Sequence, residues 1–416
     1  MGETESETPR TGIGFLAAAF EAFRYRDFRL VWIGAFTSTT GTWMQTVAQS
    51  WVVLSITGSA FYLGVDAFLA TLPMILFSLF GGVVADRVDR RNLLILSQVL
   101  QMTFAFVLAG LIFTESVEVW HIFVLSFLTG TAQSIGGPAY QALLPLLVER
   151  RDVPNAVALN SMQFNLARMI GPTLAGFALA TVGAAACFGL NGVSFIAVIV
   201  TLLMVHTSFR PKAKKTTTIL FDLREGFHFM GEHHSLIHLS LLAFATTFFG
   251  IPIVTLMPVV AKEIFGMGAT GYSWLMAASG AGSVAGALFI AGSARTERKG
   301  RMALLSLIAF ALFLLAFAFS RNLWLTLGLT FFTGASLLGV IALVSSLVQL
   351  ATSEEMRGRV MSIFMLAFRG GMPLGNLAAG WTAERWSVTT ALAVNAIAIG
   401  SIGFYFLFSR SRIREL

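Results

Sequence analysis

Long apolar segments, separated by short polar ones, cover nearly the whole chain of 416 residues. A helix needs about 20 apolar residues to cross a bilayer core of roughly 30 Å, and twelve segments are about that long. We expect these spans near residues 29–56, 60–85, 92–113, 120–147, 154–181, 184–207, 236–261, 269–292, 302–319, 322–351, 359–382 and 387–409. No segment alternates polar and apolar residues as a membrane-barrel strand does. The pattern predicts an all-α membrane protein with 12 transmembrane helices.

The longest polar interval, residues 208–235, lies between the sixth and seventh spans and divides them into two sets of six. We expect it to be a cytoplasmic linker that joins an N-terminal six-helix bundle, residues 29–207, to a C-terminal six-helix bundle, residues 236–409. The two ends of the chain are also expected to be cytoplasmic. Residues 1–28 would form a tail with an interfacial helix, and residues 410–416 a short tail.

The composition agrees with this pattern, because 56% of the residues are hydrophobic and only 12% are charged, against about 25% charged in a soluble domain. The mean hydropathy is +0.78, and a soluble fold cannot bury that much apolar surface. The single cysteine, Cys187, excludes an internal disulfide and a thiolate metal cluster. Nucleotide-binding and hydrolase motifs do not occur in the sequence. We therefore expect no metal, no cofactor and no enzymatic activity.

Lysine and arginine are distributed unevenly over the polar segments. If both termini lie in the cytoplasm, 23 of the 28 basic residues fall in cytoplasmic segments and three in outer ones. Because cytoplasmic loops carry the excess of positive charge, this distribution predicts a multi-pass protein of the cell inner membrane with both termini inside. The net charge of +7 then faces anionic lipid. Its spread over seven segments argues against a nucleic-acid partner.

A charged turn separates the second and third spans and reads GVVADRVDRR, residues 82–91. A positively charged membrane anchor needs only Lys or Arg, so this alternative explains neither Asp86 nor Asp89. The turn resembles the motif G-x-x-x-D-R-x-G-R-R/K of the major facilitator superfamily, with Asp89 in place of the last glycine. Its D-R-x-D-R-R form is similar to the branch that contains enterobactin exporters and macrolide efflux proteins. The segments FRYRDFRLVW and VQLATSEEMRGRVMSIF resemble that branch as well.

The resemblance implies the major facilitator fold and a conformational latch at this motif. In the family, the aspartate that corresponds to Asp86 lies against the N-terminus of span 11, near residues 356–359, where a helix carries partial positive charge. The flanking arginines pair with acidic groups at neighbouring helix ends. The expected latch residues are Gly82, Asp86, Arg87, Arg90, Arg91 and, as the acidic partner, Glu149.

Three ionisable residues lie within the expected spans, namely Asp66, Arg168 and Arg369. A charge inside a membrane is costly, so each should have a partner or a function. The two arginines lie 201 residues apart in the similar segments SMQFNLARMIGP and SIFMLAFRGGMP, as expected for parallel repeats. One hypothesis pairs Asp66 with Arg369 while the outer side is closed and protonates Asp66 when the pair separates. The alternatives are a permanent ion pair and an aspartate near outside water.

Polar and aromatic side chains within the spans are candidates for a substrate cavity, which spans 1, 4, 7 and 10 line in the superfamily. The candidates are Gln45 and Gln49 on span 1, Gln133, Tyr140 and Gln141 on span 4, and Phe244 and Phe248 on span 7. The alternative for each polar residue is an interhelical hydrogen bond. The glycines of GAGSVAG, residues 280–286, are interpreted as a helix–helix contact, because no strand precedes them.

The resemblance therefore predicts a secondary active transporter that works by alternating access. An exporter of an amphipathic small molecule, such as a siderophore or a drug, is the favoured activity, and proton antiport is a hypothesis for its coupling. The alternatives are a metabolite importer or facilitator and a lipid translocator. The expected partners are the small-molecule substrate, the lipid bilayer and protons, and we expect the chain to act as a monomer.

Overall fold

The structure is a computed structural model that describes residues 20–205, 219–292 and 298–409, and of residues 78–87, 219–223 and 291 it describes the backbone alone. The described residues form helices joined by short turns, so the prediction of an all-α protein is confirmed. The first part of the chain contains η1 (Glu21–Arg24), α2 (Arg26–Thr57), α3 (Ala60–Arg87), α4 (Arg90–Phe113), α5 (Val119–Leu143), η2 (Leu144–Leu146), η3 (Arg150–Asp152), α6 (Val153–Thr181) and α7 (Ala184–Met204).

The second part of the chain begins with a short helix, α8 (Ile219–Glu232), within the expected linker. It continues with α9 (His234–Gly250), α10 (Pro252–Val259), η4 (Val260–Ile264), α11 (Ala269–Gly292), α12 (Lys299–Phe319), α13 (Leu323–Leu350), α14 (Arg357–Arg385) and α15 (Val388–Phe408). Here α9, α10 and the π-turn η4 follow one another without a connecting loop, and together they occupy the expected seventh span.

Nine helical segments of the described residues are long and apolar enough to cross a membrane, and they lie in α3, α4, α7, α9 to η4 and α11 to α15. The helices α2, α5 and α6 have 32, 25 and 29 residues and carry most of the polar side chains predicted to lie inside the protein. Large apolar side chains are exposed on the outward faces; the most exposed are Phe113, Trp324 and Phe408, at 75 to 81%. A soluble protein rarely exposes such side chains, whereas lipid covers them.

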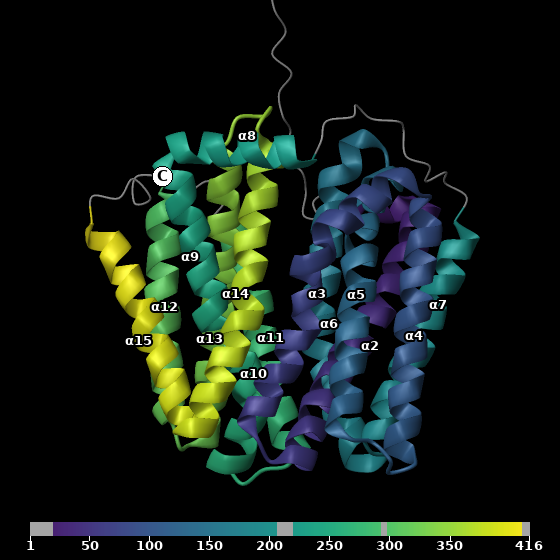
Figure 1. Ribbon diagram of the computed structural model, residues 1–416, viewed down its shortest axis with the longest axis vertical. Coiled ribbons are helices and arrows are strands. Elements are labelled where there is room, and N and C mark those ends of the chain that lie inside the picture. Colours follow the sequence, from purple (N-terminus) through teal and green to yellow (C-terminus); the bar gives the residue numbers. More distant parts are fainter. Residues whose placement is uncertain (1–19, 206–218, 293–297, 410–416) are drawn as a thin grey trace, which may run out of the picture.

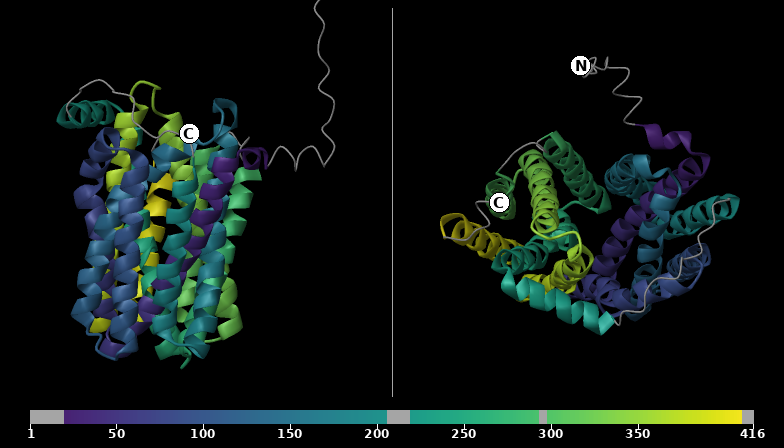
Figure 2. Two further views of the ribbon diagram at one scale, coloured as in Figure 1. Left: turned by 90° about the vertical axis from the view of Figure 1, so that its right-hand side faces the viewer. Right: turned by 90° about the horizontal axis from the view of Figure 1, so that it is seen from above.

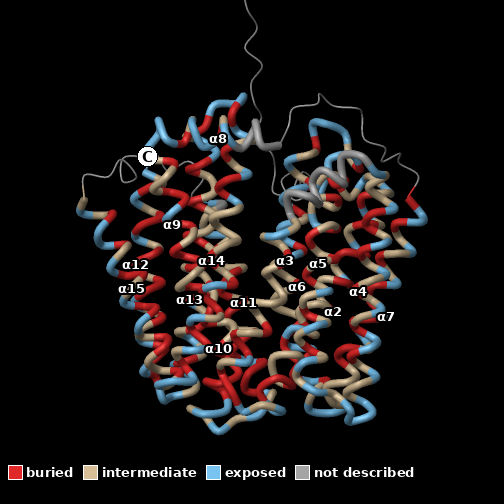
Figure 3. The backbone as a smooth tube through the Cα atoms, viewed as in Figure 1, coloured by how far each residue is buried: buried red, intermediate tan, exposed pale blue. Residues whose placement is uncertain are grey.

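The helices form two groups that lie side by side (Figures 1 and 2). We call α2 to α7 the first group and α9 to α15 the second group. Helix α8 lies across one end of the second group, which we call the α8 end, and packs on α14. Buried residues run through both groups and are frequent where the two groups meet, at the end opposite α8 (Figure 3).

The two groups touch mainly through two helix pairs, α3 with α14 and α6 with α11. At the first crossing, a Cβ atom on Gly64 would lie 2.6 Å from the carbonyl oxygen of Asn376, and one on Gly380 would lie 2.9 Å from that of Ala60. Only glycine permits such an approach of two backbones. This crossing lies close to the first turn of α3 and the last turns of α14. From it the two helices diverge toward the α8 end (Figure 1).

The glycines of residues 280–286 form the helix–helix contact that the sequence predicts. A Cβ atom on Gly280 would lie 2.9 Å from the carbonyl oxygen of Arg168 in α6, and one on Gly286 would lie 2.9 Å from the Cα atom of Ala335 in α13. One short segment of α11 therefore packs against its own group on one side and against the first group on another.

Candidate functional site

The interior of the first group becomes accessible toward the α8 end, as one face of α5 shows. Ser126, Gln133 and Gly137 lie on this face, because they are spaced seven and four residues apart. Ser126 is buried, whereas Gly137, nearer the α8 end, is exposed. The face does not point to lipid, since the lipid-side residue Leu128 lies nine residues, or about 180°, from Gly137. This face of α5 is therefore accessible in its half nearer the α8 end and buried in the other half.

Asp66 of α3 lies at the closed end of this interior and is only 6% exposed. The amide nitrogen Nε2 of Gln49 donates to its two carboxylate oxygens at 3.0 and 2.8 Å, and Ser126 Oγ donates to Oδ1 at 2.5 Å. Gln49 Nε2 also lies 2.8 Å from Ser126 Oγ. Side chains from α2, α3 and α5 thus form one closed hydrogen-bonded cluster around a single carboxylate.

The hypothesis that Asp66 pairs with Arg369 while the opposite end is closed is wrong for this conformation. Among the described residues, no ion pair involves Asp66, and two neutral donors bind its carboxylate instead. The cause is its position on the helix. Gly64 faces α14, and two residues correspond to about 200° around a helix, so Asp66 points away from α14 toward α2 and α5.

Arg168 of α6 and Arg369 of α14 occupy equivalent faces of their helices. Each lies nine residues before an exposed residue, Phe177 in α6 and Ala378 in α14, and therefore on the opposite, inward side. The guanidinium of Arg168 lies 5.5 Å from the ring centroid of Trp43 in α2, within the range of a cation–π interaction. Both arginines are half-buried, and neither forms an ion pair with a described residue.

The predicted cavity residues of the first group mostly form hydrogen bonds between helices. Asn191 of α7 donates to Gln45 at 2.6 Å, and Gln133 donates to Gln101 of α4 at 3.3 Å. The hydroxyl of Tyr140 donates to the amide oxygen of Asn160 in α6 at 2.7 Å. Gln141 is exposed, and the others are half-buried. Their role as substrate contacts stays a prediction, because half-burial permits both a structural bond and contact with a ligand.

Phe244 and Phe248 of α9 stack with ring centroids 5.8 Å apart and are half-buried. They flank the helix contact with α14, where a Cβ atom on Gly371 would lie 2.9 Å from the backbone nitrogen of Phe248. The pair therefore forms an aromatic surface next to the turn of α14 that carries Arg369.

A carboxylate joins the two groups at the end opposite α8, and the sequence analysis did not identify it. Glu384, in the last turn of α14, accepts hydrogen bonds through Oε2 from Ser59 Oγ at 2.9 Å, from the backbone N–H of Ala60 at 2.9 Å and from that of Phe61 at 3.4 Å. These donors form the N-terminus of α3, where a negative charge is favourable. The signal in the sequence is weak, because a serine before a helix and an acidic residue 325 positions later show no relation until the chain folds.

Part of the predicted latch lies outside the described residues, because only the backbone of Gly82, Asp86 and Arg87 is described. Arg90 donates to the carbonyl of Ala142 at 3.3 Å, and Arg91 donates to the carbonyl of Val205. The carboxylate of Asp89 accepts a hydrogen bond from the backbone nitrogen of Arg91 at 2.9 Å and caps α4. Capping gives a physical reason for the aspartate that replaces the glycine of the superfamily motif.

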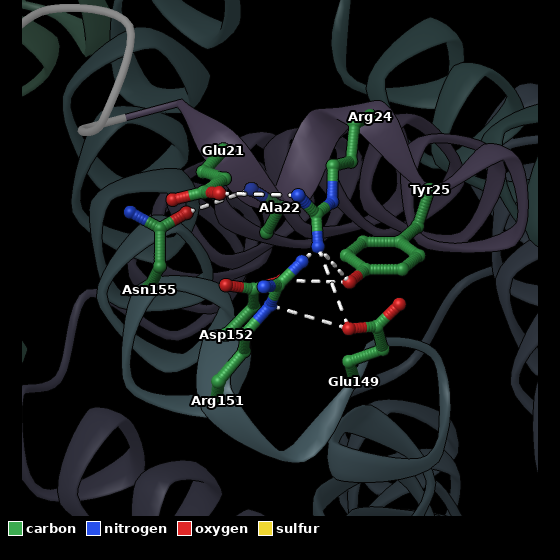
Figure 4. Close-up of polar contacts among 8 residues, drawn as sticks. All are labelled: Glu21, Ala22, Arg24, Tyr25, Glu149, Arg151, Asp152 and Asn155. Atoms are coloured by element: carbon green, nitrogen blue, oxygen red, sulfur yellow. Dashed lines mark hydrogen bonds and ion pairs between the residues drawn. The ribbon is translucent and has the colours of Figure 1, made fainter. Parts of the chain in front are cut away.

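Glu149 was expected to pair with the arginines of the motif, but its side chain has other partners. Its contacts in the described part of the chain are ion pairs with Arg151 at 3.2 Å and Arg24 at 3.7 Å (Figure 4). Arg24 is held more closely by the buried carboxylate of Asp152 at 2.7 Å, which also accepts from the hydroxyl of Tyr25 at 2.6 Å. The hydrogen bond with Tyr25 raises the pKa of Arg24. This cluster fixes η1 and the start of α2 to the start of α6, within the first group.

Comparison with known proteins places these features in a family. The family described as transmembrane secretion effector matches residues 17–416. The staphyloferrin A transporter of Staphylococcus aureus is 24% identical over 90% of this chain and 94% of its own length. The enterobactin exporter EntS of Escherichia coli O1:K1 is 26% identical over 90% and 85%. The multidrug efflux pump Tap of Mycolicibacterium fortuitum is 24% identical over 93% and 96%.

Solved structures share the fold at low sequence identity. The nucleoside transporter NupG aligns with a TM-score of 0.73 and 16% identity, over 93% of this chain and all of its own length. A bacterial homologue of the human lysosomal transporter Spinster aligns with a TM-score of 0.71 and 12% identity, over 92% and 95%. Because the family match extends over nearly all of the sequence, the chain is a multi-span membrane transporter that belongs to the transmembrane secretion effector family of the major facilitator superfamily.

Proposed function

We propose that the chain is a secondary active exporter of an amphipathic small molecule, a siderophore or a drug, that works by alternating access. The observation that carries the proposal is the match of residues 17–416 to a family whose relatives over most of this chain are named a staphyloferrin A transporter, an enterobactin exporter and a multidrug efflux pump. Import of a metabolite and lipid translocation are the alternatives.

The proposal counts α9, α10 and η4 as one span, which gives twelve spans in two bundles of six, and it places the α8 end in the cytoplasm with both chain termini. The arginines at the N-termini of α4 and α14 support this orientation, since they lie at the α8 end and cytoplasmic segments are rich in basic residues. In this orientation the conformation described here is open to the cytoplasm, the side from which an exporter binds its substrate.

Alternating access requires that one side closes when the other opens. Glu384 on the N-terminus of α3 would hold the outer side closed in the present conformation. The motif around Asp86 would hold the cytoplasmic side closed in the other one, by placing its carboxylate on the N-terminus of α14. Each latch would place an acidic side chain on the positive end of a helix in the opposite bundle.

Profiling a deletion strain tests the proposed activity. Cells without the chain should retain a small molecule that the wild-type cells export, and a plasmid copy of the wild-type gene should restore export. The purified protein in proteoliposomes should then move that molecule, and empty liposomes provide the control. Loss of uptake instead of loss of export would favour the importer. Movement of a fluorescent phospholipid between leaflets, with no flux of small molecules, would favour the lipid translocator.

For proton coupling, we propose Asp66 as the proton carrier. It is the acidic side chain placed deep within a span, and its carboxylate is bound by neutral donors, so it can take up a proton without breaking an ion pair. Asp66→Asn should abolish transport against a gradient driven by protons, yet retain downhill exchange of the substrate. Ser126→Ala serves as a control, because it removes the hydrogen bonds of the Ser126 hydroxyl with Asp66 and Gln49 and leaves the carboxyl group in place. Concentrative transport by Asp66→Asn would exclude Asp66 as the coupling site.

A further inference from the structure

We propose that the transported molecule is an organic anion with at least two negative groups, and that Arg168 and Arg369 bind it from the two bundles. This inference rests on the proposed export function and specifies the class of its substrate. It starts from a pair of cations at equivalent positions of the two repeats, 201 residues apart, on helices of the same length of 29 residues.

The two arginines lie at similar depths. Arg168 is the sixteenth residue of α6 and Arg369 the thirteenth of α14, which places them ~22 Å and ~18 Å from the α8 end of their helices at about 1.5 Å per residue. Each points inward, opposite an exposed residue of its helix. Since α6 and α14 belong to different groups, a molecule that binds both arginines would connect the two groups.

Among the described residues, no carboxylate forms an ion pair with Arg168 or Arg369. Other arginines at the α8 end have acidic partners, for example Arg24 with Asp152 and Arg359 with Glu225, at 2.7 and 3.1 Å. Asp66, which lies deep within a span, accepts hydrogen bonds from Gln49 and Ser126 instead of pairing with an arginine. A guanidinium is costly within a membrane protein unless a counter-charge approaches it. Two such groups at matching positions therefore indicate that the counter-charges come from a ligand.

The chemistry of the neighbouring side chains further limits the chemical class of the ligand. A guanidinium binds carboxylate, phosphate and similar oxyanions through paired hydrogen bonds. Trp43 lies against Arg168, and the stacked pair of Phe244 and Phe248 lies next to the turn of α14 that carries Arg369. These rings offer apolar surface beside each cation. The site therefore fits an amphipathic molecule that carries anionic groups at two separated points and an aromatic or aliphatic body between them.

A pair of dyes with a shared xanthene core tests this inference in proteoliposomes. Carboxyfluorescein carries several negative charges at neutral pH, and rhodamine 6G carries one positive charge. We expect saturable transport of carboxyfluorescein and none of rhodamine 6G. Arg168→Gln and Arg369→Gln should each lower the carboxyfluorescein rate at least tenfold, and the double variant should abolish it. Arg385→Gln, which removes an exposed arginine from the end of α14, should transport at the wild-type rate.

Thermal unfolding of the same variants distinguishes ligand binding from a structural role. If the arginines bind an external anion, the glutamine variants should unfold at the wild-type temperature or above. In that case each variant lacks a positive charge that has no counter-charge in the protein without its ligand. Citrate should raise the unfolding temperature of the wild-type protein and not that of the double variant. A lower unfolding temperature of both single variants, with no effect of citrate on the wild type, would overturn the inference.

The outcomes also separate this inference from the proposed export function. Transport of rhodamine 6G that both glutamine variants retain would overturn the anion site and leave export intact. If the deletion strain retains only cationic or neutral compounds, the anion site is also overturned and the export function stands. If the deletion strain retains no compound and the proteoliposomes transport neither dye, the export function itself fails.

Discussion

Removal of the Glu384 carboxylate should shift the protein toward the conformation that is open on the side opposite α8. Its Oε2 atom accepts three hydrogen bonds from the start of α3, two at 2.9 Å and one at 3.4 Å. The other bundle supplies all three donors, so the bonds exist only while this end is closed. Glu384→Ala removes them, and Glu384→Gln keeps an acceptor oxygen but removes the negative charge.

The size of the shift follows from the position of the carboxylate. A helix cap contributes about 1 kcal/mol, and a charge at an exposed helix terminus adds roughly 0.3–1 kcal/mol. Glu384 is exposed, which favours the lower half of the range for the charge. We therefore expect Glu384→Ala to cost the closed arrangement about 1.5 kcal/mol, which is roughly a tenfold change in the ratio of the two conformations. Glu384→Gln should produce about a third to a half of that change.

Electron–electron distance measurements can detect this shift. Nitroxide labels at Val182 and Lys262, two exposed positions at this end in different groups, would report its opening in a Cys187→Ala background. The ratio of long to short distances should rise about tenfold in Glu384→Ala. Glu115→Gln is the matched control, because it removes an exposed acidic side chain at the same end. An unchanged distance distribution in Glu384→Ala, or an equal shift in the control, would refute the role of the cap.

Three further outcomes are expected. Gly64→Leu should abolish transport, because the leucine side chain would collide with the backbone of α14. Gly110→Leu is the control and should transport normally, because its side chain would point into open space; flux assays measure both variants. Asp152→Asn should lower the unfolding temperature by a few degrees, since Arg24 loses a charged partner at 2.7 Å, and calorimetry measures this. Asp86→Asn should impair transport at normal expression and favour the form that is open at the α8 end, as thiol accessibility would show. Wild-type transport and accessibility would mean that the motif is only a positively charged membrane anchor.

The helices could largely be predicted from the sequence, because each long apolar segment ends at charged or turn-forming residues. The second span was expected at 60–85 and α3 covers Ala60–Arg87; the sixth was expected at 184–207 and α7 covers Ala184–Met204. The break between α9 and α10 was not predicted. It lies at Pro252, which has no N–H for the helix and whose ring disfavours helical continuity.

The site was predicted less completely, because partners depend on how each helix is rotated against its neighbours. Gln45 and Gln49 were recognised as polar residues within the first span, yet nothing in the sequence identifies Asn191 or Ser126 as their partners. Asp66 was assigned to Arg369 as a charge of opposite sign within the expected spans, and this does not reveal that Asp66 lies on the far side of α3 from Gly64. Glu384 was missed for the related reason that its donors belong to a distant segment.

The position of the Gly64–Gly380 crossing limits how the two bundles can move. From Gly64, α3 extends four residues to its start and 23 residues to its end, or ~6 Å and ~35 Å at 1.5 Å per residue. If the crossing acts as a fulcrum, these unequal lever arms convert a 10 Å displacement at the α8 end into less than ~2 Å at the other end. Such leverage can open and close the α8 end while the contact of Glu384 with the N-terminus of α3 is kept at the other end. A passage for a solute at the end opposite α8 then requires the crossing itself to separate, as a second movement distinct from the opening of the α8 end.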